Sequence, residues 1–112
     1  MDLIGGMVTY NEAAAYLRIS LAQNECYISD LCKEAEDTCR GIANLKQDKW
    51  VEIADYYGND TDKRQMKEIL RIGVLYAIGW YYENGFNADI HDVCLTLRNL
   101  YFPIREGAVK WE

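Results

Sequence analysis

The residues of this 112-residue chain whose types suit thiol or metal chemistry are four cysteines and a single histidine. They are Cys26, Cys32, Cys39, Cys94 and His91. Structural zinc is held by four such ligands, which commonly include two cysteines in a C-x-x-C spacing. The chain contains no C-x-x-C pair. We therefore predict no metal site and no bound cofactor.

His91 and Cys94 have the spacing of a thiol nucleophile and its base, because residues three apart are neighbours on a helix. Cys94 also falls on an apolar helical stripe, where burial keeps a thiol protonated and unreactive. Cys32 and Cys39, one heptad apart, fit the same description. We expect reduced cysteines that act as small hydrophobic residues, and no enzyme activity. An enzyme built on His91 and Cys94 is the alternative, which a Cys94→Ser variant tests.

Charge and composition exclude several classes of protein. The 12 Lys and Arg against 18 Asp and Glu give a formal net charge of -6, which argues against a domain that grips nucleic acid. The longest uncharged stretch, Ile72 to Tyr82, is far shorter than the roughly 20 apolar residues that span a bilayer. Residues 1–7 lack the basic start of a signal peptide. These observations predict a single cytosolic domain over residues 1–112 that has no contact with a membrane.

Amphipathic helices account for the first part of the chain. Thr9 and Glu12 have the spacing of a capping box, and the helix that they begin should end near residue 18 or 19. A second helix is predicted over about 24–44. Its apolar stripe is Ile28, Leu31, Cys32, Ala35, Cys39 and Ile42. Its opposite face, expected to meet water, carries Lys33, Glu34, Glu36, Asp37 and Arg40.

Residues 45 to 61 fit either a short amphipathic helix or a loop, because Trp50, Ile53 and Tyr57 leave both open. The next helix is expected to start at Thr61 or Asp62, with Gln65 completing a second capping box. A last helix is predicted over about 89–101, ended by Pro103 and followed by a tail over 103–112.

The central helix is apolar on nearly all sides. One stripe contains Met66, Ile69, Leu70, Gly73, Ala77 and Trp80. A helix of this kind is buried on all sides, and a chain this small cannot easily surround it. The surplus surface is predicted to face another subunit, through Ile72, Tyr76, Gly79 and Tyr82. The expected fold is all-α: a small bundle of four to five helices with a long buried central helix.

Four segments, read in order, carry a resemblance to a known family. They are residues 8–12 with 16–19, the helix 28–42 with Glu34-Ala35 at its centre, residues 69–84 with the run Trp80-Tyr81-Tyr82-Glu83-Asn84, and residues 97–106. Together they cover most of the chain and resemble the phage head–tail connector family, also described as head-completion adaptor or DNA-packaging proteins. The chain departs from the family pattern at Gly85, where many relatives have arginine, and in its additional residues 1–7.

The resemblance implies a structural subunit of a ring of about twelve copies, with a heterologous interface between neighbours. The ring would dock on the portal protein, extend the DNA channel and receive a downstream stopper or tail-completion protein. DNA would be passing cargo, and an acidic wall suits this role because it repels phosphate. Such a subunit would assemble in the host cytoplasm and end at the head–tail junction of the virion.

Two segments acquire roles from the same resemblance. In such proteins the loop before the central helix tends to line the channel; here its polar residues are Lys46, Asp48, Lys49, Asp55, Asn59 and Asp60. The C-terminal segment tends to engage the portal; here the residues are Arg98, Tyr101, Phe102, Ile104, Arg105, Lys110 and Trp111. The competing hypothesis is a small cytosolic helical module that binds or regulates another protein. Rings, alone or with portal protein, favour the connector, whereas a persistent monomer with a non-phage partner favours the module.

Overall fold

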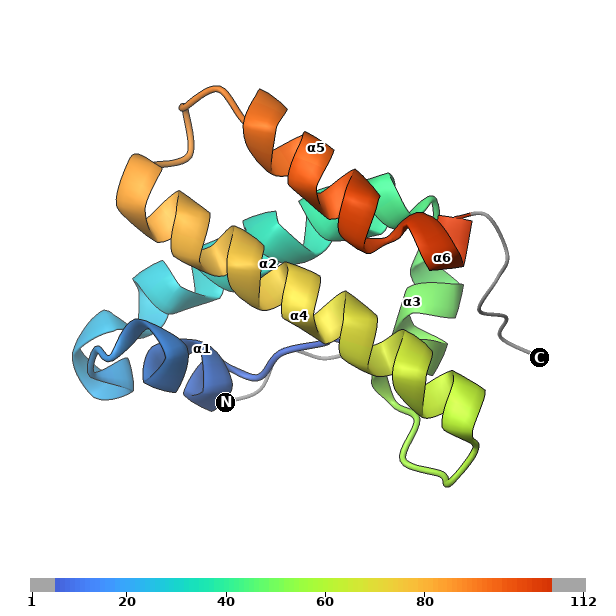
Figure 1. Cartoon of the computed structure of the whole chain (residues 1–112). Coiled ribbons are helices and arrows are strands. Elements are labelled where there is room, and N and C mark those ends of the chain that lie inside the picture. The colour runs from blue at the N-terminus through green and yellow to red at the C-terminus, as the bar shows by residue number, and fades with distance from the viewer. Residues whose placement is uncertain (1–5, 106–112) are drawn as a thin grey trace.

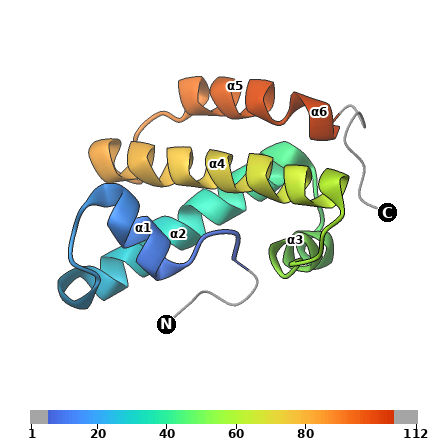
Figure 2. The same ribbon diagram turned by 60° about the horizontal axis from the view of Figure 1, so that its bottom comes forward.

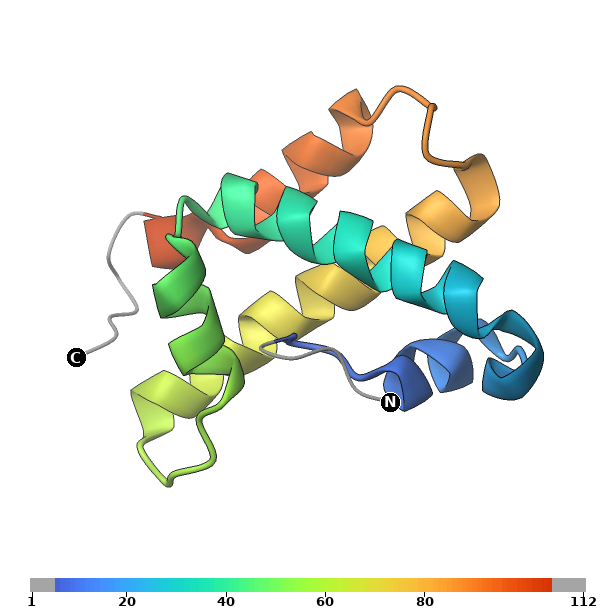
Figure 3. The same cartoon turned by 180° about the vertical axis from the view of Figure 1, so that it is seen from behind.

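Six helices and no strand make up residues 6–105, the part of the chain that the computed structural model describes (Figure 1). They are α1 (Tyr10–Leu17), α2 (Leu21–Ala43), α3 (Gln47–Ala54), α4 (Thr61–Asn84), α5 (His91–Leu100) and α6 (Phe102–Arg105). The long helices α2 and α4 cross at the centre of the molecule, and α5 runs back along α4 (Figures 1 and 2). Helices α1 and α3 pack near opposite ends of α4 (Figure 3). The prediction of a small all-α bundle is confirmed.

Short polar side chains set the starts of α1 and α4. The capping box of α1 forms as predicted: the Glu12 amide donates to Thr9 Oγ1 at 3.1 Å, and the Thr9 amide donates to Glu12 Oε1 at 3.0 Å. At α4 the cap is Asp60, whose Oδ1 accepts from the Lys63 amide at 3.1 Å. The prediction of a second capping box with Gln65 is wrong, because Asp60 caps the helix two residues ahead of Asp62, which puts Lys63 and not Gln65 three residues after the cap.

Helix α2 begins at Leu21, ahead of the predicted start near Asn24. Ser20 caps it, and its Oγ accepts from the Gln23 amide. Asn24 departs from helical geometry, with φ -130° and ψ 21°, while its side-chain amide donates to the Ser20 carbonyl oxygen at 2.8 Å. An Asn side chain that bonds the local backbone competes with the helix, which explains the kink where the sequence pattern placed the start.

The core lies between α2 and α4 and is closed by α1, α3 and α5. The predicted α2 stripe is buried from Ile28 to Cys39, and Ile42 is half-buried. Helix α4 buries one side, whereas Ile72 and Tyr76 on the other side stay 48% and 39% exposed. Within residues 6–105, none of the helices combines the length and apolar character that a membrane crossing requires. The described chain therefore leaves apolar surface of α4 uncovered.

The C-terminal end differs from the predicted single helix. Helix α5 ends at Leu100, and Pro103 lies inside the short α6 instead of ending the helical path. Proline is compatible with the first turn of a helix, where its missing amide needs no partner.

Candidate protein-binding surfaces

Three of the four interface residues predicted on α4 are exposed, namely Ile72, Tyr76 and Tyr82. The fourth, Gly79, is covered by Tyr16 of α1, because a Cβ at Gly79 would lie 3.1 Å from Tyr16 Cε2. Gly79 thus permits close packing of α1 on α4 within one chain. Tyr16 is itself 50% exposed and continues the apolar surface. We call Tyr16, Ile72 and Tyr76 the α1/α4 surface.

A second exposed aromatic cluster joins α2 to the C-terminal end of α4. The rings of Tyr27 and Tyr82 have centroids 6.0 Å apart, and Phe86 lies 6.3 Å from Tyr27 in an edge-to-face arrangement. All three side chains are about two-fifths exposed. Tyr82 therefore belongs to this cluster and not to the α1/α4 surface with which it was grouped.

The segment predicted to line a channel, residues 45–60, is half helical, since α3 covers residues 47–54. Buried Trp50 and Ile53 fix α3 to the core. Among the predicted channel residues, Lys49 is half-buried and its Nζ lies 3.1 Å from Glu52 Oε2. The other five are exposed: Lys46, Asp48, Asp55, Asn59 and Asp60.

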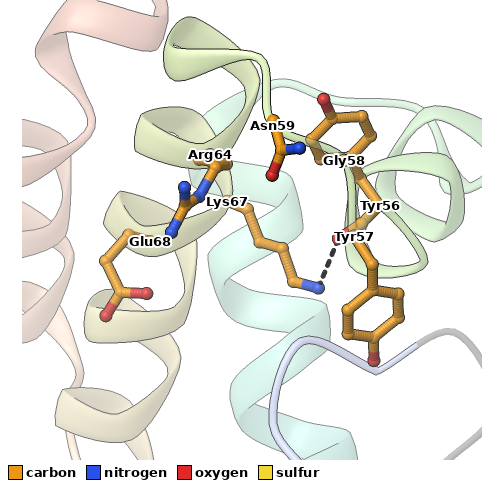
Figure 4. Close-up of a pocket in the computed structure, with 7 residues that line it drawn as sticks. All are labelled: Tyr56, Tyr57, Gly58, Asn59, Arg64, Lys67 and Glu68. Atoms are coloured by element: carbon orange, nitrogen blue, oxygen red, sulfur yellow. Dashed lines mark hydrogen bonds between the residues drawn. The ribbon is translucent and has the colours of Figure 1, made fainter.

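The loop between α3 and α4 forms a cationic pocket that sequence reasoning missed (Figure 4). It encloses about 300 Å³ and is lined by Tyr56, Tyr57, Gly58, Asn59, Arg64, Lys67 and Glu68. Lys67 Nζ donates to the Tyr56 carbonyl oxygen at 2.8 Å and lies 3.9 Å from the centroid of the Tyr57 ring. The Tyr56 hydroxyl accepts from the Asp60 amide at 2.8 Å, which closes the loop over Gly58. These bonds hold an ordered loop against the start of α4.

Two residues predicted to bind a portal from the tail belong to the core. Tyr101 is fully buried, and its hydroxyl donates to the Leu70 carbonyl oxygen at 3.0 Å. Ile104 is 8% exposed. The hypothesis is wrong for these two residues, because α6 folds back onto the bundle instead of extending away from it.

The other predicted tail residues are distributed differently. Arg98 is exposed, and Phe102 is 59% exposed. Arg105 is exposed, yet its Nη1 donates to a backbone carbonyl near the end of α2 at 2.7 Å. Lys110 and Trp111 lie outside the described residues.

Glu36, predicted to face water, is 5% exposed and accepts three hydrogen bonds. Its Oε2 accepts from the amides of Met7 at 2.7 Å and Val8 at 3.2 Å, while its Oε1 accepts from Trp50 Nε1 at 2.7 Å. Burial raises the pKa of Glu36 against the lowering effect of these donors. The prediction that Glu36 faces water is wrong. Its carboxylate is buried because it ties the segment before α1 and helix α3 to the middle of α2.

A charged contact ties the start of α1 to α4. The Arg71 guanidinium forms an ion pair with Glu12 and also donates to the Met7 carbonyl oxygen at 2.8 Å. The hydrogen bond from Arg71 holds the pKa of Glu12 below its usual value. The capping residue of α1 is thus also a tertiary contact.

The four cysteines differ in exposure, which predicts their reactivity. Burial raises the pKa of the Cys32 and Cys39 thiols to about 12, whereas Cys26 is exposed and Cys94 half-buried. We expect Cys26 to react fast with Ellman's reagent at neutral pH, Cys94 more slowly, and the other two only as the protein unfolds. Parallel titrations with and without denaturant measure this. Fast labelling of Cys39 in the native protein would contradict the burial of its side chain.

Within residues 6–105, no three His, Cys, Asp or Glu residues are placed to hold a metal ion together. Comparisons with protein-family models, curated proteins and solved structures find no match for this chain. The features with potential for recognition are therefore the α1/α4 surface, the aromatic cluster of Tyr27, Tyr82 and Phe86, and the cationic pocket.

Proposed function

We propose that this chain is a structural subunit of a phage head–tail connector ring, which docks on a portal protein and extends the DNA channel. The observation that carries the proposal is the α1/α4 surface. Ile72 and Tyr76 lie one helical turn apart on the longest described helix and stay 48% and 39% exposed, and Tyr16 packs over Gly79, one turn further along α4. Aromatic and aliphatic side chains placed in this way are typical of the centre of a protein interface.

The resemblance in four ordered segments is the reason for proposing a connector and not another kind of protein-binding domain. The net charge of the chain is compatible with this role. A net charge of -6 keeps the channel wall from holding DNA through its phosphates. In the proposed ring, exposed Asp48, Asp55 and Asp60 face the passing DNA from α3 and the loop after it. Exposed Arg98 and Phe102 are the described residues that remain for contact with the portal.

Electron microscopy of the protein mixed with the portal protein of the same genome tests the proposal directly. Closed rings stacked on the portal support it. A chain that stays monomeric and leaves the portal undecorated contradicts it, and capture of a non-phage partner by that monomer would support a regulatory binding module instead.

Substitutions on the α1/α4 surface give a sharper test. We expect Ile72→Asp and Tyr76→Asp each to weaken ring assembly at least about tenfold, because a carboxylate in a dry interface is left without a partner. Their stability should change by no more than about 0.5 kcal/mol, since both side chains are exposed. Assembly is measured by sedimentation over a concentration series, and folding by circular dichroism.

Leu95→Asp is the matched control, because Leu95 on α5 has the same 48% exposure as Ile72. It introduces the same charge on a different helix. Equal loss of assembly in Leu95→Asp and Ile72→Asp would show that net charge, and not the α1/α4 surface, governs the contact.

A further inference from the structure

The cationic pocket is built to receive an anion. Lys67 is held in place by the Tyr56 carbonyl oxygen and the Tyr57 ring. Its ammonium group has three N–H donors, and one of them forms the hydrogen bond to Tyr56. Arg64, one turn earlier on α4, forms no ion pair with any other described residue. Figure 4 shows the Lys67 side chain extending toward the loop, and the Arg64 guanidinium directed toward Glu68. Glu68 contributes one negative charge, and it lies 3.7 Å from Arg71 Nε.

The other end of the molecule carries a pocket of opposite charge. It also encloses about 300 Å³ and lies between α1 and the start of α2, lined by Tyr10, Glu25, Cys26, Ser29 and Asp30. Tyr10 and Ser29 share a hydrogen bond of 2.9 Å that fixes its floor. Both carboxylates are exposed. Figures 1 and 3 place the α1–α2 corner and the α3–α4 loop at opposite ends of the bundle.

We propose that the cationic pocket of one copy receives the Glu25 and Asp30 carboxylates of the next copy. This inference rests on the proposed function and names the contact between neighbouring subunits. Two unlike patches at opposite ends of one chain give a head-to-tail interface, which closes into a ring when the rotation allows it. The guanidinium of Arg64 suits a carboxylate because its fork binds both oxygens. Two copies that each carry a charge of -6 repel overall, so the local pairing decides the geometry.

Charge reversal tests this pairing in the intact protein. Arg64→Glu and the double variant Glu25→Lys, Asp30→Lys should each raise the dissociation constant of self-association at least about tenfold. Neither changes a buried residue, and circular dichroism checks that both variants fold. An equimolar mixture of the two should associate again. The pocket altered by Arg64→Glu then meets the surface altered by Glu25→Lys and Asp30→Lys, and the two unaltered surfaces also meet. Mass photometry and sedimentation equilibrium provide the readout.

Lys33→Glu is the matched control, since it makes the same change of net charge at an exposed basic residue on α2 that lines neither pocket. Equal weakening by Lys33→Glu and Arg64→Glu would overturn the proposal. So would failure of the mixture to associate, or a wild-type chain that is monomeric up to about 1 mM. Portal-docked rings that form equally well with Arg64→Glu would overturn this contact and leave the connector function standing.

Discussion

Replacing Glu36 with alanine is expected to lower the free energy of unfolding by about 3–5 kcal/mol. The substitution leaves the amides of Met7 and Val8 and the indole N–H of Trp50 without their buried acceptor. Each orphaned donor costs about 1–3 kcal/mol, and part of this is recovered by water that enters the space. The change also releases the N-terminal segment and α3 from α2. Urea denaturation followed by tryptophan fluorescence measures the effect and reports on Trp50.

Two controls distinguish the loss of the Glu36 hydrogen bonds from the loss of its charge and from the effect of an alanine in α2. Glu34→Ala removes a carboxylate from the exposed face of the same helix, and we expect a change within about 0.5 kcal/mol. Glu36→Gln keeps an acceptor oxygen but replaces the other one with a donor, so its loss of stability should be intermediate. A Glu36→Ala variant as stable as Glu34→Ala would contradict the role given to Glu36.

The raised pKa of Glu36 gives these variants a pH dependence of known sign. Between the ordinary value of 4.5 and the raised value, the native state binds more protons at this site than the unfolded state. The stability contributed by Glu36 is therefore fully present below pH 4.5 and falls as the pH rises through the raised pKa. We expect the advantage of the wild type over Glu36→Gln to narrow as the pH rises. An advantage that widens instead would mean that the pKa is lowered.

Comparison with Glu36→Gln removes the opposite contribution of Glu12. The lowered pKa of Glu12 supplies stability at neutral pH that is lost as the pH falls through it, and both proteins share this contribution.

Helices α1, α2, α4 and α5 could be predicted from local information, because each was visible as an apolar period or as a cap. The pattern left α3 open between helix and loop, and it did not predict α6. Thr9 and Glu12 are three residues apart, and their capping box formed as predicted. Glu36 shows the limit of that reasoning. It lies one turn from both Cys32 and Cys39, so the period of the α2 stripe includes it, but its charge led to the prediction of a solvated position. Its partners are 14 to 29 residues away in the sequence and could not be inferred from spacing.

For the candidate surfaces too, features that follow from local spacing could be predicted, and contacts between distant residues could not. Exposure of Ile72 and Tyr76 was predictable, because their helix had more apolar sides than one small chain covers. The burial of Tyr101 was not, because it depends on a contact with α4 that no local pattern announces. The cationic pocket was missed for a similar reason: it requires the loop to fold back so that the Tyr56 carbonyl oxygen meets Lys67.

The contact between Tyr101 and α4 is also the basis of the second prediction with a large expected effect on stability. Gly73→Ala is expected to destabilise the protein by about 2–3 kcal/mol, although alanine favours a helix over glycine by about 1 kcal/mol. A Cβ at Gly73 would lie 2.7 Å from Tyr101 Cε1 and nearer still to the hydroxyl oxygen. The Tyr101 ring cannot swing away at low cost, because it is fully buried and its hydroxyl donates to the Leu70 carbonyl oxygen. Thermal and urea denaturation measure the loss.

Gly41 provides the matched control for that substitution. It also lies inside a long helix, but a Cβ there would meet nothing within 4 Å, so Gly41→Ala should stabilise the protein by about 0.5–1 kcal/mol. A double-mutant cycle with Tyr101→Leu isolates the steric contribution: the paired variant should be less destabilised than the sum of the single changes, because the alanine methyl occupies space that the ring vacates. Equal and favourable effects at Gly41 and Gly73 would mean that α5 and α6 do not hold Tyr101 against α4. The covered side of the central helix would then be open as well, and the α1/α4 surface would lose its distinction as the side left for a neighbouring subunit.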